Sequence, residues 1–301
     1  MNLVLVVEPA AEEDIFYEHL WNEECRVGLG VKFLEVLGSL FDHILENPLS
    51  YVEAGLRSRD MTMPEEINRL CTDVLCDYLF TTDPGADENL RAEGVADEKI
   101  IFVGNVMIDS LLQHKAVAEK LTTGRDMGLA VGQYALLTLH RPSNVDDKET
   151  LNGIFEALIS IAEQLPIVFP IHPRTRKMME VFGLTHYLKL REDGMGILVT
   201  EPLGYLEFLH LIMNARMVLT DSGGLQEETT VLGVPCITLR HNTERPITVE
   251  QGTNVVIGND KQRILAAAND VLEGRVVGGH VPEKWDGKSA ERIVEWLVGN
   301  A

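Results

Sequence analysis

Short apolar runs alternate with amphipathic stretches along most of the chain. Strand-like apolar runs lie at 99–104, 134–140, 166–172, 196–200, 216–221, 235–240 and 254–258. Between them, the stretches 146–165 and 204–215 carry apolar side chains at the spacing of one helix face. Strands separated by single helices are typical of βαβ units, so the pattern predicts an α/β fold with parallel sheets.

The apolar runs are fewer in the first third of the chain. The strand-like runs that precede residue 98 are 3–7, 50–54 and 78–82, with helical patterns near 31–46 and 64–77. We therefore expect a smaller sheet at the N-terminal end and a full doubly wound sheet after it. The expected segments are a reduced Rossmann-like domain at 1–110, a linker at 111–125, a second Rossmann-like domain at 126–285 and a helix at 286–301. The last helix, with Ile293, Trp296 and Leu297 on one side, is expected to pack onto either domain.

Composition narrows the classes of partner. The chain has 47 acidic residues against 26 Lys and Arg, a formal net charge of −21, whereas binding to nucleic acid requires a basic footprint. No apolar run approaches the roughly 18 residues needed to cross a bilayer, and the run at 3–7 is too short for a signal peptide. The four cysteines, Cys25, Cys71, Cys76 and Cys236, form no CxxC pair. We therefore expect a reduced, cytoplasmic protein without a metal site.

The segment 219–240 combines a strand end, a glycine turn and a helix. Asp221-Ser222-Gly223-Gly224 stands at the start of that helix. Ser222 is expected to cap it, while Gly223 and Gly224 let backbone N–H groups approach an anion closely. Glu228, further along the helix, is suited to accept two hydroxyl groups of a sugar ring, whereas Glu227 is expected to contribute little to binding. The arrangement predicts a nucleotide site, with an ordinary strand-to-helix turn as the alternative.

Basic side chains follow three other strands. His140 and Arg141 come after the run 134–140, where side chains of a parallel sheet point into the ligand crevice. Arg141 is suited to pair with a diphosphate, and His140 to donate a hydrogen bond to it or to move a proton. Arg245 and His172 are further candidates for substrate binding. A solvated polar loop is the alternative interpretation at each position.

The segment 51–69 is the most polar part of the N-terminal region. Glu53 ends an apolar strand, where packing gives no reason for a carboxylate. Thr62-x-x-Glu65 with Pro64 predicts a capping box. Two carboxylates near a phosphate site would also suit acid–base chemistry at a sugar carbon, so both interpretations of Glu65 stay open. Arg57 and Arg69 are expected to pair with these two acids.

Taken in order, these stretches resemble the non-hydrolysing UDP-N-acetylglucosamine 2-epimerases. The matching motifs, from about Tyr51 to Gly258, are YVEAGLRS, MPEEINR, VGNVMIDSL, LTLHRPSNVDD, PIHPRT, LTDSGGLQEE and TERPITVEQGTN. The resemblance implies a GT-B-like architecture, with the nucleotide sugar between two Rossmann-like domains. It implies catalytic carboxylates at Glu53 and Glu65, a basic pair at His140 and Arg141, diphosphate contacts at Ser222 and Gly223, and a ribose contact at Glu228.

The reaction that the resemblance implies interconverts UDP-N-acetylglucosamine and UDP-N-acetylmannosamine for cell-surface polysaccharide synthesis. A base removes the proton from C2 of the sugar while UDP leaves C1, and UDP adds back after reprotonation on the other face. No redox cofactor or metal is required. The expected ligands are UDP-N-acetylglucosamine and UDP; nucleic acid and membranes are not expected as partners, and a homodimer is left open.

The stretch before Tyr51 departs from the family pattern. The family's first strand ends in Gly-Thr-Arg-Pro-Glu, where this chain reads LVLVVEPAAEEDIF, and no Gly-Asp-Thr with its catalytic Asp precedes Tyr51. We therefore expect tight binding of UDP with slow or absent epimerisation. Two alternatives stay open, a UDP-sugar-binding homologue with little or no turnover and a hydrolysing 2-epimerase that releases the free sugar.

Overall fold

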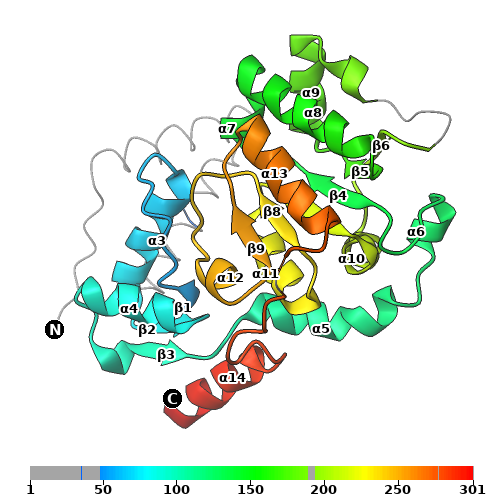
Figure 1. The fold of residues 1–301 in the computed structure, drawn as a ribbon. Coiled ribbons are helices and arrows are strands. Elements are labelled where there is room, and N and C mark those ends of the chain that lie inside the picture. Colours follow the sequence, from blue (N-terminus) through cyan, green and yellow to red (C-terminus); the bar gives the residue numbers. More distant parts are fainter. Residues whose placement is uncertain (1–34, 36–47, 189–193, 277, 301) are drawn as a thin grey trace.

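Two parallel β-sheets with flanking helices form the described part of the protein (Figure 1). The structure, a computed structural model, describes residues 48–188, 194–276 and 278–300, together with the single position 35. The strand expected at 3–7 and, apart from Glu35, the helix expected near 31–46 lie outside the described residues. The arrangement of strands and helices confirms the predicted α/β fold.

The smaller sheet contains three parallel strands in the order β1-β2-β3. They are β1 (Ser50–Ala54), β2 (Tyr78–Thr81) and β3 (Ile100–Phe102). The helices α3 (Pro64–Leu75) and α4 (Pro84–Ala92) and a 3-10 turn at Asp97–Lys99 connect them. Each expected strand of this region that lies within the described residues is present, and the apolar run at 99–104 supplies the third.

The larger sheet contains six parallel strands in the order β6-β5-β4-β7-β8-β9. Its strands are β4 (Ala135–Thr138), β5 (Ile167–Pro170), β6 (Ile197–Thr200), β7 (Met217–Thr220), β8 (Cys236–Thr238) and β9 (Asn254–Val256). Strands are added outward from β4 in one direction and then, from β7, in the other. This is the strand order of a Rossmann fold, and it predicts a ligand crevice between β4 and β7.

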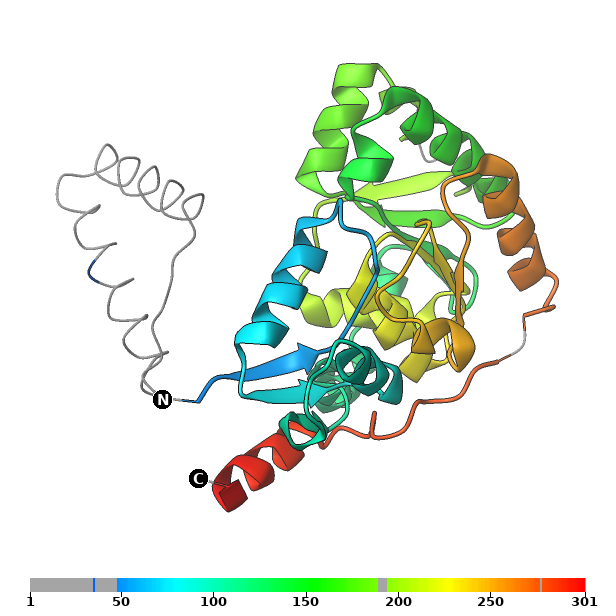
Figure 2. The same cartoon turned by 90° about the vertical axis from the view of Figure 1, so that its left-hand side faces the viewer.

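Helices cover both faces of the larger sheet (Figures 1 and 2). The helices after β3 are α5 (Val106–Ala118), α6 (Thr123–Asp126), α7 (Pro142–Val145), α8 (Lys148–Ala162), α9 (Pro173–Phe182), α10 (Tyr205–Asn214), α11 (Gly223–Leu232), α12 (Ile247–Glu250), α13 (Lys261–Leu272) and α14 (Ser289–Asn300), with a 3-10 turn at Thr185–Tyr187. In β4, Ala135 and Leu137 enter one apolar core while Leu136 enters another. Because both faces are buried, such strands read as continuous apolar runs rather than as alternating patterns.

The helix α5 connects the two sheets. It runs without interruption across residue 110, and its Leu111 and Ala118 pack with Leu209 of α10. Most of the segment expected as a linker is therefore helical and packed. The domain boundaries at 110 and 125 stay a prediction.

The chain returns to the smaller sheet at its C-terminal end (Figure 2). The buried Trp285 donates from Nε1 to the carbonyl oxygen of Thr82 over 2.9 Å. In α14, the ring of Trp296 lies edge-on to Tyr78 and Phe80, with centroids 4.5 Å and 5.5 Å away. Of the two packing sites left open for the last helix, it therefore occupies the one on the N-terminal sheet.

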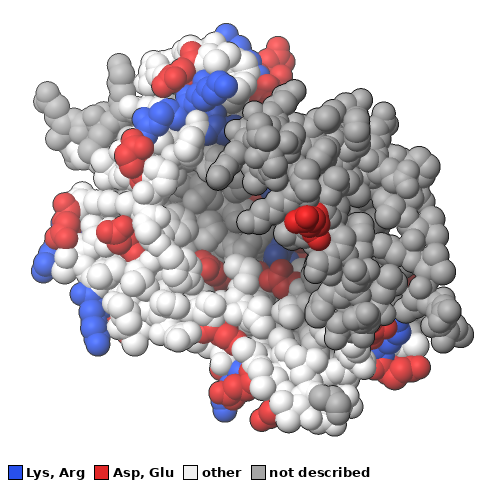
Figure 3. Space-filling view, turned by 180° about the vertical axis from the view of Figure 1, so that it is seen from behind, with Lys and Arg blue, Asp and Glu red and all other residues white. Residues whose placement is uncertain are grey.

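The surface seen in Figure 3 mixes acidic and basic side chains, with Lys and Arg gathered at its upper edge. The two arginines of α9 are paired, Arg174 with Asp146 and Arg176 with Glu201. Within the described residues, no helix combines the length and the apolar character needed to cross a membrane.

Candidate active site

The candidate site lies where the strand order of the larger sheet reverses, between β4 and β7. Adjacent helices diverge to opposite faces at such a point and leave a crevice at the carboxyl ends of the strands. The two strands end side by side, and the hydroxyl oxygens of Thr138 and Thr220 are 2.6 Å apart. The chain continues from there to His140 on one side and to Ser222 on the other.

Asp221 joins the two strand ends. Its carboxylate, fully buried, accepts hydrogen bonds from the backbone N–H groups of His140 and Arg141 at 2.9 and 2.8 Å, and lies 3.0 Å from Nδ1 of His140. Burial acts to raise the pKa of Asp221, but the hydrogen bonds from His140 and Arg141 outweigh it and hold the pKa below its ordinary value. The ionised carboxylate thus orients the His140 ring and leaves Nε2 available to a ligand.

The helix α11 begins with unsatisfied backbone donors. Ser222 is its N-cap residue, but the Ser222 side chain accepts no hydrogen bond from the helix, so the predicted side-chain cap is wrong. The hydroxyl lines a cavity instead, while the Ser222 backbone N–H donates to Thr220 Oγ1 over 2.9 Å. Within the described part of the chain, the N–H groups of Gly223 and Gly224 have no acceptor. Free N–H groups at a helix start favour the binding of an anion.

A cavity of about 450 Å³ opens at this helix start. Its polar lining includes His140, His172, Ser222 and Glu228, and its apolar lining includes Met107, Leu139, Pro202, Leu203, Phe208 and Leu225. Glu228 is buried and accepts a hydrogen bond from the Tyr205 hydroxyl over 3.3 Å. Burial raises the pKa of Glu228 to about 6. An anion site, a carboxyl group and an apolar wall therefore face one space.

His172 enters the same cavity from the end of β5. It is the N-cap residue of α9, and its Nδ1 accepts from the backbone N–H of Arg174 over 3.1 Å. The ring centroids of His172 and His140 are 5.5 Å apart. The fold thus brings both predicted histidines to the cavity that Ser222, Gly224 and Glu228 line.

Arg245 lies behind the glycine turn and not in the cavity lining. Arg245 is 9% exposed, and its guanidinium pairs with Glu227 through Nε at 2.9 Å and with Glu244 through Nη1 at 2.5 Å. A Cβ on Gly223 would stand 2.5 Å from Nη1 of Arg245. Gly223 therefore permits the close approach of this ion pair to the helix start, a second reason for a glycine at this position.

Glu53 ends β1 in a strained backbone conformation. Its φ is +70°, in the left-handed region, and the pairing of β1 with β2 shifts register between Val52 and Ala54. Burial raises the pKa of Glu227 to about 7, and the negative charge of Glu53 adds to this against the opposing charge of Arg245. Glu53 is therefore close enough to the base of the glycine turn to interact with it. Strain of this kind is concentrated at functional sites.

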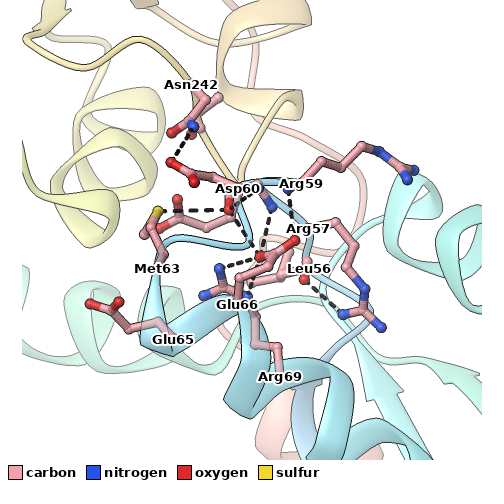
Figure 4. A network of polar contacts seen from close by, with 12 residues as sticks. Leu56, Arg57, Arg59, Asp60, Met63, Glu65, Glu66, Arg69 and Asn242 are labelled. Atoms are coloured by element: carbon pink, nitrogen blue, oxygen red, sulfur yellow. Dashed lines mark hydrogen bonds and ion pairs between the residues drawn. The ribbon is translucent and has the colours of Figure 1, made fainter.

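The loop that follows Glu53 is organised by Glu66 (Figure 4). The buried Glu66 carboxylate accepts from the backbone N–H groups of Ser58 and Arg59 at 3.0 and 2.7 Å, and it pairs with Arg69 at 2.6 Å. These hydrogen bonds from Ser58 and Arg69 lower the pKa of Glu66 against the opposing effect of burial. The residue after the predicted Glu65 thus carries the structural role in this segment.

Two expectations for this segment are wrong. The capping box does not form, because α3 starts after the N-cap Met63 and the Thr62 hydroxyl donates to Asp60 instead. Arg57 does not pair with Glu53 or Glu65; it forms ion pairs with Asp73 and Glu93, both at 2.6 Å. Arg69 pairs with Glu66, three residues before it on α3, at 2.6 Å. Asp73 and Glu66 belong to α3, whereas Glu93 lies at the end of α4, so two helices bring these partners to the loop.

Glu65 faces the C-terminal part of the molecule. Its exposed carboxylate accepts from Nη1 of Arg141 over 3.2 Å, and nearby Asn242 donates to Asp60 over 3.2 Å. A second cavity, of about 470 Å³, has Glu65, Arg141 and Asn242 in its lining. Glu65 and Arg141, 76 residues apart in sequence, therefore meet across the cleft.

Three further residues of the site have no role in the sequence-based interpretation: Asp221, Asn105 and Glu227. Asn105 is fully buried after β3, and its Nδ2 donates to Oε1 of Glu227 over 2.9 Å. A polar residue at or shortly after a strand end was an available signal: Asp221 follows β7 directly, and Asn105 follows β3 after Val103 and Gly104. No local signal indicates the buried partners of Glu227, which are Asn105 and Arg245. Among the described residues, no group of three or more His, Cys, Asp or Glu side chains is placed to hold a metal ion.

The chain is similar to known proteins. A family model described as UDP-N-acetylglucosamine 2-epimerase matches residues 35–298. A protein named UDP-N-acetylglucosamine 2-epimerase from Methanocaldococcus jannaschii is 45% identical over 271 residues, which are 87% of this chain and 71% of that protein. A protein named UDP-2,3-diacetamido-2,3-dideoxy-D-glucuronate 2-epimerase from Pseudomonas aeruginosa is 39% identical over 271 residues, with the same coverage of 87% and 71%.

Solved structures agree. A crystal structure of the M. jannaschii UDP-GlcNAc 2-epimerase in complex with UDP-GlcNAc and UDP matches with a TM-score of 0.77 at 46% identity, covering 87% of this chain and 72% of that chain. A UDP-GlcNAc 2-epimerase from Neisseria meningitidis bound to UDP-GlcNAc matches with a TM-score of 0.74 at 28% identity, with coverage of 87% and 72%. The expected GT-B-like architecture is confirmed. By the extent of the family match and the identity to its relatives, the chain belongs to the UDP-N-acetylglucosamine 2-epimerase family.

Proposed function

We propose that this protein is an isomerase that interconverts UDP-N-acetylglucosamine and UDP-N-acetylmannosamine. The observation that carries the proposal is the cavity between β4 and β7, where free N–H groups of α11 and the buried Glu228 line one ligand-sized space. Membership of the family and the identity to the M. jannaschii protein support the same substrate.

The parts of a nucleotide sugar fit different parts of this cavity. The diphosphate binds at the N–H groups of Gly223 and Gly224 and at the Ser222 hydroxyl, with Arg141 and the charge of Arg245 nearby. Glu228 accepts the two ribose hydroxyls. The base packs on the apolar wall that Leu203, Phe208 and Leu225 provide.

The chemistry is elimination of UDP followed by its re-addition. A base takes the proton from C2 while the bond between C1 and the UDP oxygen breaks, which leaves a glucal and UDP in the site. A proton then returns to C2 on the other face, and UDP adds back to C1. Glu53 and Glu65 are the carboxylates suited to these transfers. UDP gains negative charge as it departs. His140, which Asp221 orients, stabilises this charge together with Arg141 and the start of α11.

The same cavity supports a second outcome, binding without efficient turnover. Before Tyr51 the sequence has no counterpart of the family's Gly-Asp-Thr motif, whose Asp takes part in catalysis. General acid–base help is worth roughly 10²–10⁴-fold, so its loss leaves UDP bound and epimerisation slow. The name of the P. aeruginosa relative suggests a second substrate to test beside the first, UDP-2,3-diacetamido-2,3-dideoxy-D-glucuronate.

Incubation with UDP-N-acetylglucosamine in D₂O, followed by NMR, tests the proposal. UDP-N-acetylmannosamine with deuterium at C2 supports the epimerase, and free N-acetylmannosamine with UDP indicates the hydrolysing reaction. Saturable binding without exchange at C2 identifies the binding homologue. Glu53→Gln is the control, expected to bind UDP like the wild type and to lose exchange. Absence of UDP binding in the wild type overturns the assignment.

Two properties of the working protein complete the proposal. We propose a cytoplasmic location, where the product supplies cell-surface polysaccharide synthesis; the free thiols of Cys71, Cys76 and Cys236 support a reducing compartment. We also propose a homodimer. Cell fractionation and light scattering test the two, and a monomer in solution would remove the second.

A further inference from the structure

A buried ionic cluster lies behind the glycine turn of α11. It consists of Glu227 on α11 and of Arg240, Glu244 and Arg245 after β8, with exposed fractions of 1%, 6%, 2% and 9%. Arg240 pairs with Glu244 at 2.7 Å, Glu244 with Arg245 at 2.5 Å, and Arg245 with Glu227 at 2.9 Å. A buried charge depends on its partner, because removing one member leaves the other uncompensated. The position of each side chain is therefore set by its neighbours.

Gly223 is the point at which this cluster meets the anion site. A Cβ on Gly223 would stand 2.5 Å from Nη1 of Arg245 and 2.5 Å from Oε1 of Glu244. The guanidinium thus lies directly against the backbone whose N–H groups are free for a diphosphate. The buried guanidinium attracts an anion at this position, and the ionised Glu244 carboxylate at the same distance opposes it, so the exact position of the guanidinium decides the net attraction.

Glu227 holds the guanidinium from its other side. Its Oε1 lies 2.9 Å from Nε of Arg245 and accepts from Nδ2 of Asn105 over 2.9 Å. Among the described residues, its Oε2 has no hydrogen-bond partner. Asn105 is fixed in turn, because its Oδ1 caps α5 by accepting from the Met107 N–H over 2.9 Å. One carboxylate oxygen therefore connects Arg245 to the helix that leaves the smaller sheet.

We propose that Glu227 is a positioning residue for the diphosphate: through Oε1 it holds Arg245 against Gly223, and Asn105 fixes Glu227. This inference rests on the proposed function, because it takes the diphosphate to bind at the start of α11. It revises the expectation that Glu227 contributes little to binding. It also explains why a carboxylate follows the glycines one turn later: Glu227 orients the cation behind them.

The direction in which UDP affinity changes distinguishes a positioning role of Glu227 from an effect of its charge alone. At a pH above about 7, where the Glu227 carboxylate is ionised, Glu227 brings a negative charge near the bound diphosphate, so removing only the charge strengthens the binding of UDP. Removing the acceptor oxygen frees Arg245 and weakens the binding of UDP. Gln at this position keeps Oε1 and loses the charge, whereas Met keeps the shape and loses both. Since Oε2 has no partner in the described residues, the amide group of Gln breaks no hydrogen bond.

Calorimetric titration of the full-length protein with UDP and with uridine, which lacks phosphate, tests the inference. Glu227→Met is expected to lose about tenfold or more in affinity for UDP, because the buried ion pair that positions Arg245 is lost, and to bind uridine like the wild type. Glu227→Gln is expected to bind UDP at least as tightly as the wild type. Glu250→Gln, which changes an exposed carboxylate at the end of α12, is the matched control.

Asn105→Ser provides a second test that does not alter Glu227. Serine still caps α5, but its side chain is too short to reach Glu227, so a smaller loss confined to UDP is expected. If the ratio of UDP to uridine affinity is unchanged in Glu227→Met and Asn105→Ser, because neither ligand or both ligands lose affinity equally, the inference is overturned. A wild type that binds no UDP would instead overturn the proposed function on which it rests.

Discussion

At the scale of single residues, three carboxyl groups around the start of α11 behave differently because their surroundings differ. Asp221 accepts hydrogen bonds from two backbone N–H groups and from His140, and its pKa stays below the ordinary value despite burial. Glu228 has a hydrogen bond from Tyr205, and burial raises its pKa to about 6. Glu227 is buried among charges of both signs, and its pKa rises to about 7. The start of α11 therefore combines an ionised carboxylate, Asp221, with two carboxyl groups whose pKa values are raised by burial, Glu227 and Glu228.

The stability of the wild type relative to Glu227→Gln is expected to fall as the pH rises. Burial raises the pKa of Glu227 from its ordinary 4.5 to about 7, so between these values the folded state keeps a proton that the unfolded chain has lost. This contribution is complete below 4.5 and is lost as the pH rises through about 7. We expect a relative loss of about 1–3 kcal/mol across this window, measured by urea denaturation. Parallel curves for the two proteins would contradict the assignment.

Glu228→Ala is expected to weaken the binding of UDP by about 1–3 kcal/mol, because charge-assisted hydrogen bonds to the ribose are lost. Uridine carries the same ribose, so its binding should weaken equally. Calorimetry with both ligands checks this, and it separates Glu228 from Glu227, whose replacement by Met acts on UDP alone. A loss confined to UDP would remove Glu228 from the ribose contact.

At the scale of elements, one carboxylate shapes the connection between β1 and α3. Glu66, in the first turn of α3, accepts from Ser58 and Arg59, and Arg59 adopts a φ of +59° in the loop. The loop presents Asp60 to Asn242 (Figure 4). Glu65, at the start of α3, accepts from Arg141. The helix start thus fixes both groups that face the larger sheet.

Glu66→Gln is expected to destabilise the protein by about 2–3 kcal/mol, because an amide offers one acceptor oxygen where the carboxylate uses two. Amide hydrogen exchange at Ser58 and Arg59 should accelerate more than exchange in the larger sheet. Denaturation and exchange measured by NMR check both effects. The control is Glu65→Gln, at an exposed position, with an expected change below about 0.5 kcal/mol. Similar losses in the two variants would contradict the special role of Glu66.

At the scale of the whole molecule, the last segment of the chain binds the two sheets together. Trp285 packs with Ile108 of α5 and Ile247 of α12, and its indole donates to Thr82 after β2. Lys284 and Arg292 donate to the carbonyl oxygens of Phe102 and Val103 at the end of β3. The contacts across the cleft, by contrast, are polar and few among the described residues. In the described residues, the C-terminal segment therefore supplies the apolar contacts that join the two sheets.

Trp296→Ala is expected to lower the free energy of unfolding by about 1–3 kcal/mol, below the usual range for a fully buried tryptophan because the side chain is partly exposed. The loss arises from its edge-on contacts with Tyr78 and Phe80. Guanidinium denaturation monitored by circular dichroism measures it. Val298→Ala on the same helix, where the side chain is 76% exposed, should change stability by less than about 0.5 kcal/mol. An effect of Trp296→Ala no larger than this would show that α14 contributes little.

The sequence by itself determined the elements and the strand ends that carry chemistry. Strands such as β4 and β7 are continuous apolar runs because both faces of their sheet are covered, and this burial is visible in the residues themselves. His140 and Ser222 follow those strands, and parallel strands place such residues at one edge. The family motifs also indicated the ligand class, because each motif is a short, continuous stretch of sequence.

Only the tertiary structure decided which polar groups pair. Asn105 meets Glu227 across 122 residues of sequence, and the Arg141 backbone meets Asp221 across 80. Local patterns predicted a Ser222 side-chain cap and a Thr62–Glu65 box; in the structure Ser222 lines the cavity and the Thr62 hydroxyl donates to Asp60. Adjacent glutamates differ in role for the same reason: Glu227 turns inward to Arg245 and Glu228 lines the cavity. The choice depends on which side of the helix the rest of the chain covers, and no stretch of ten or twenty residues contains that information.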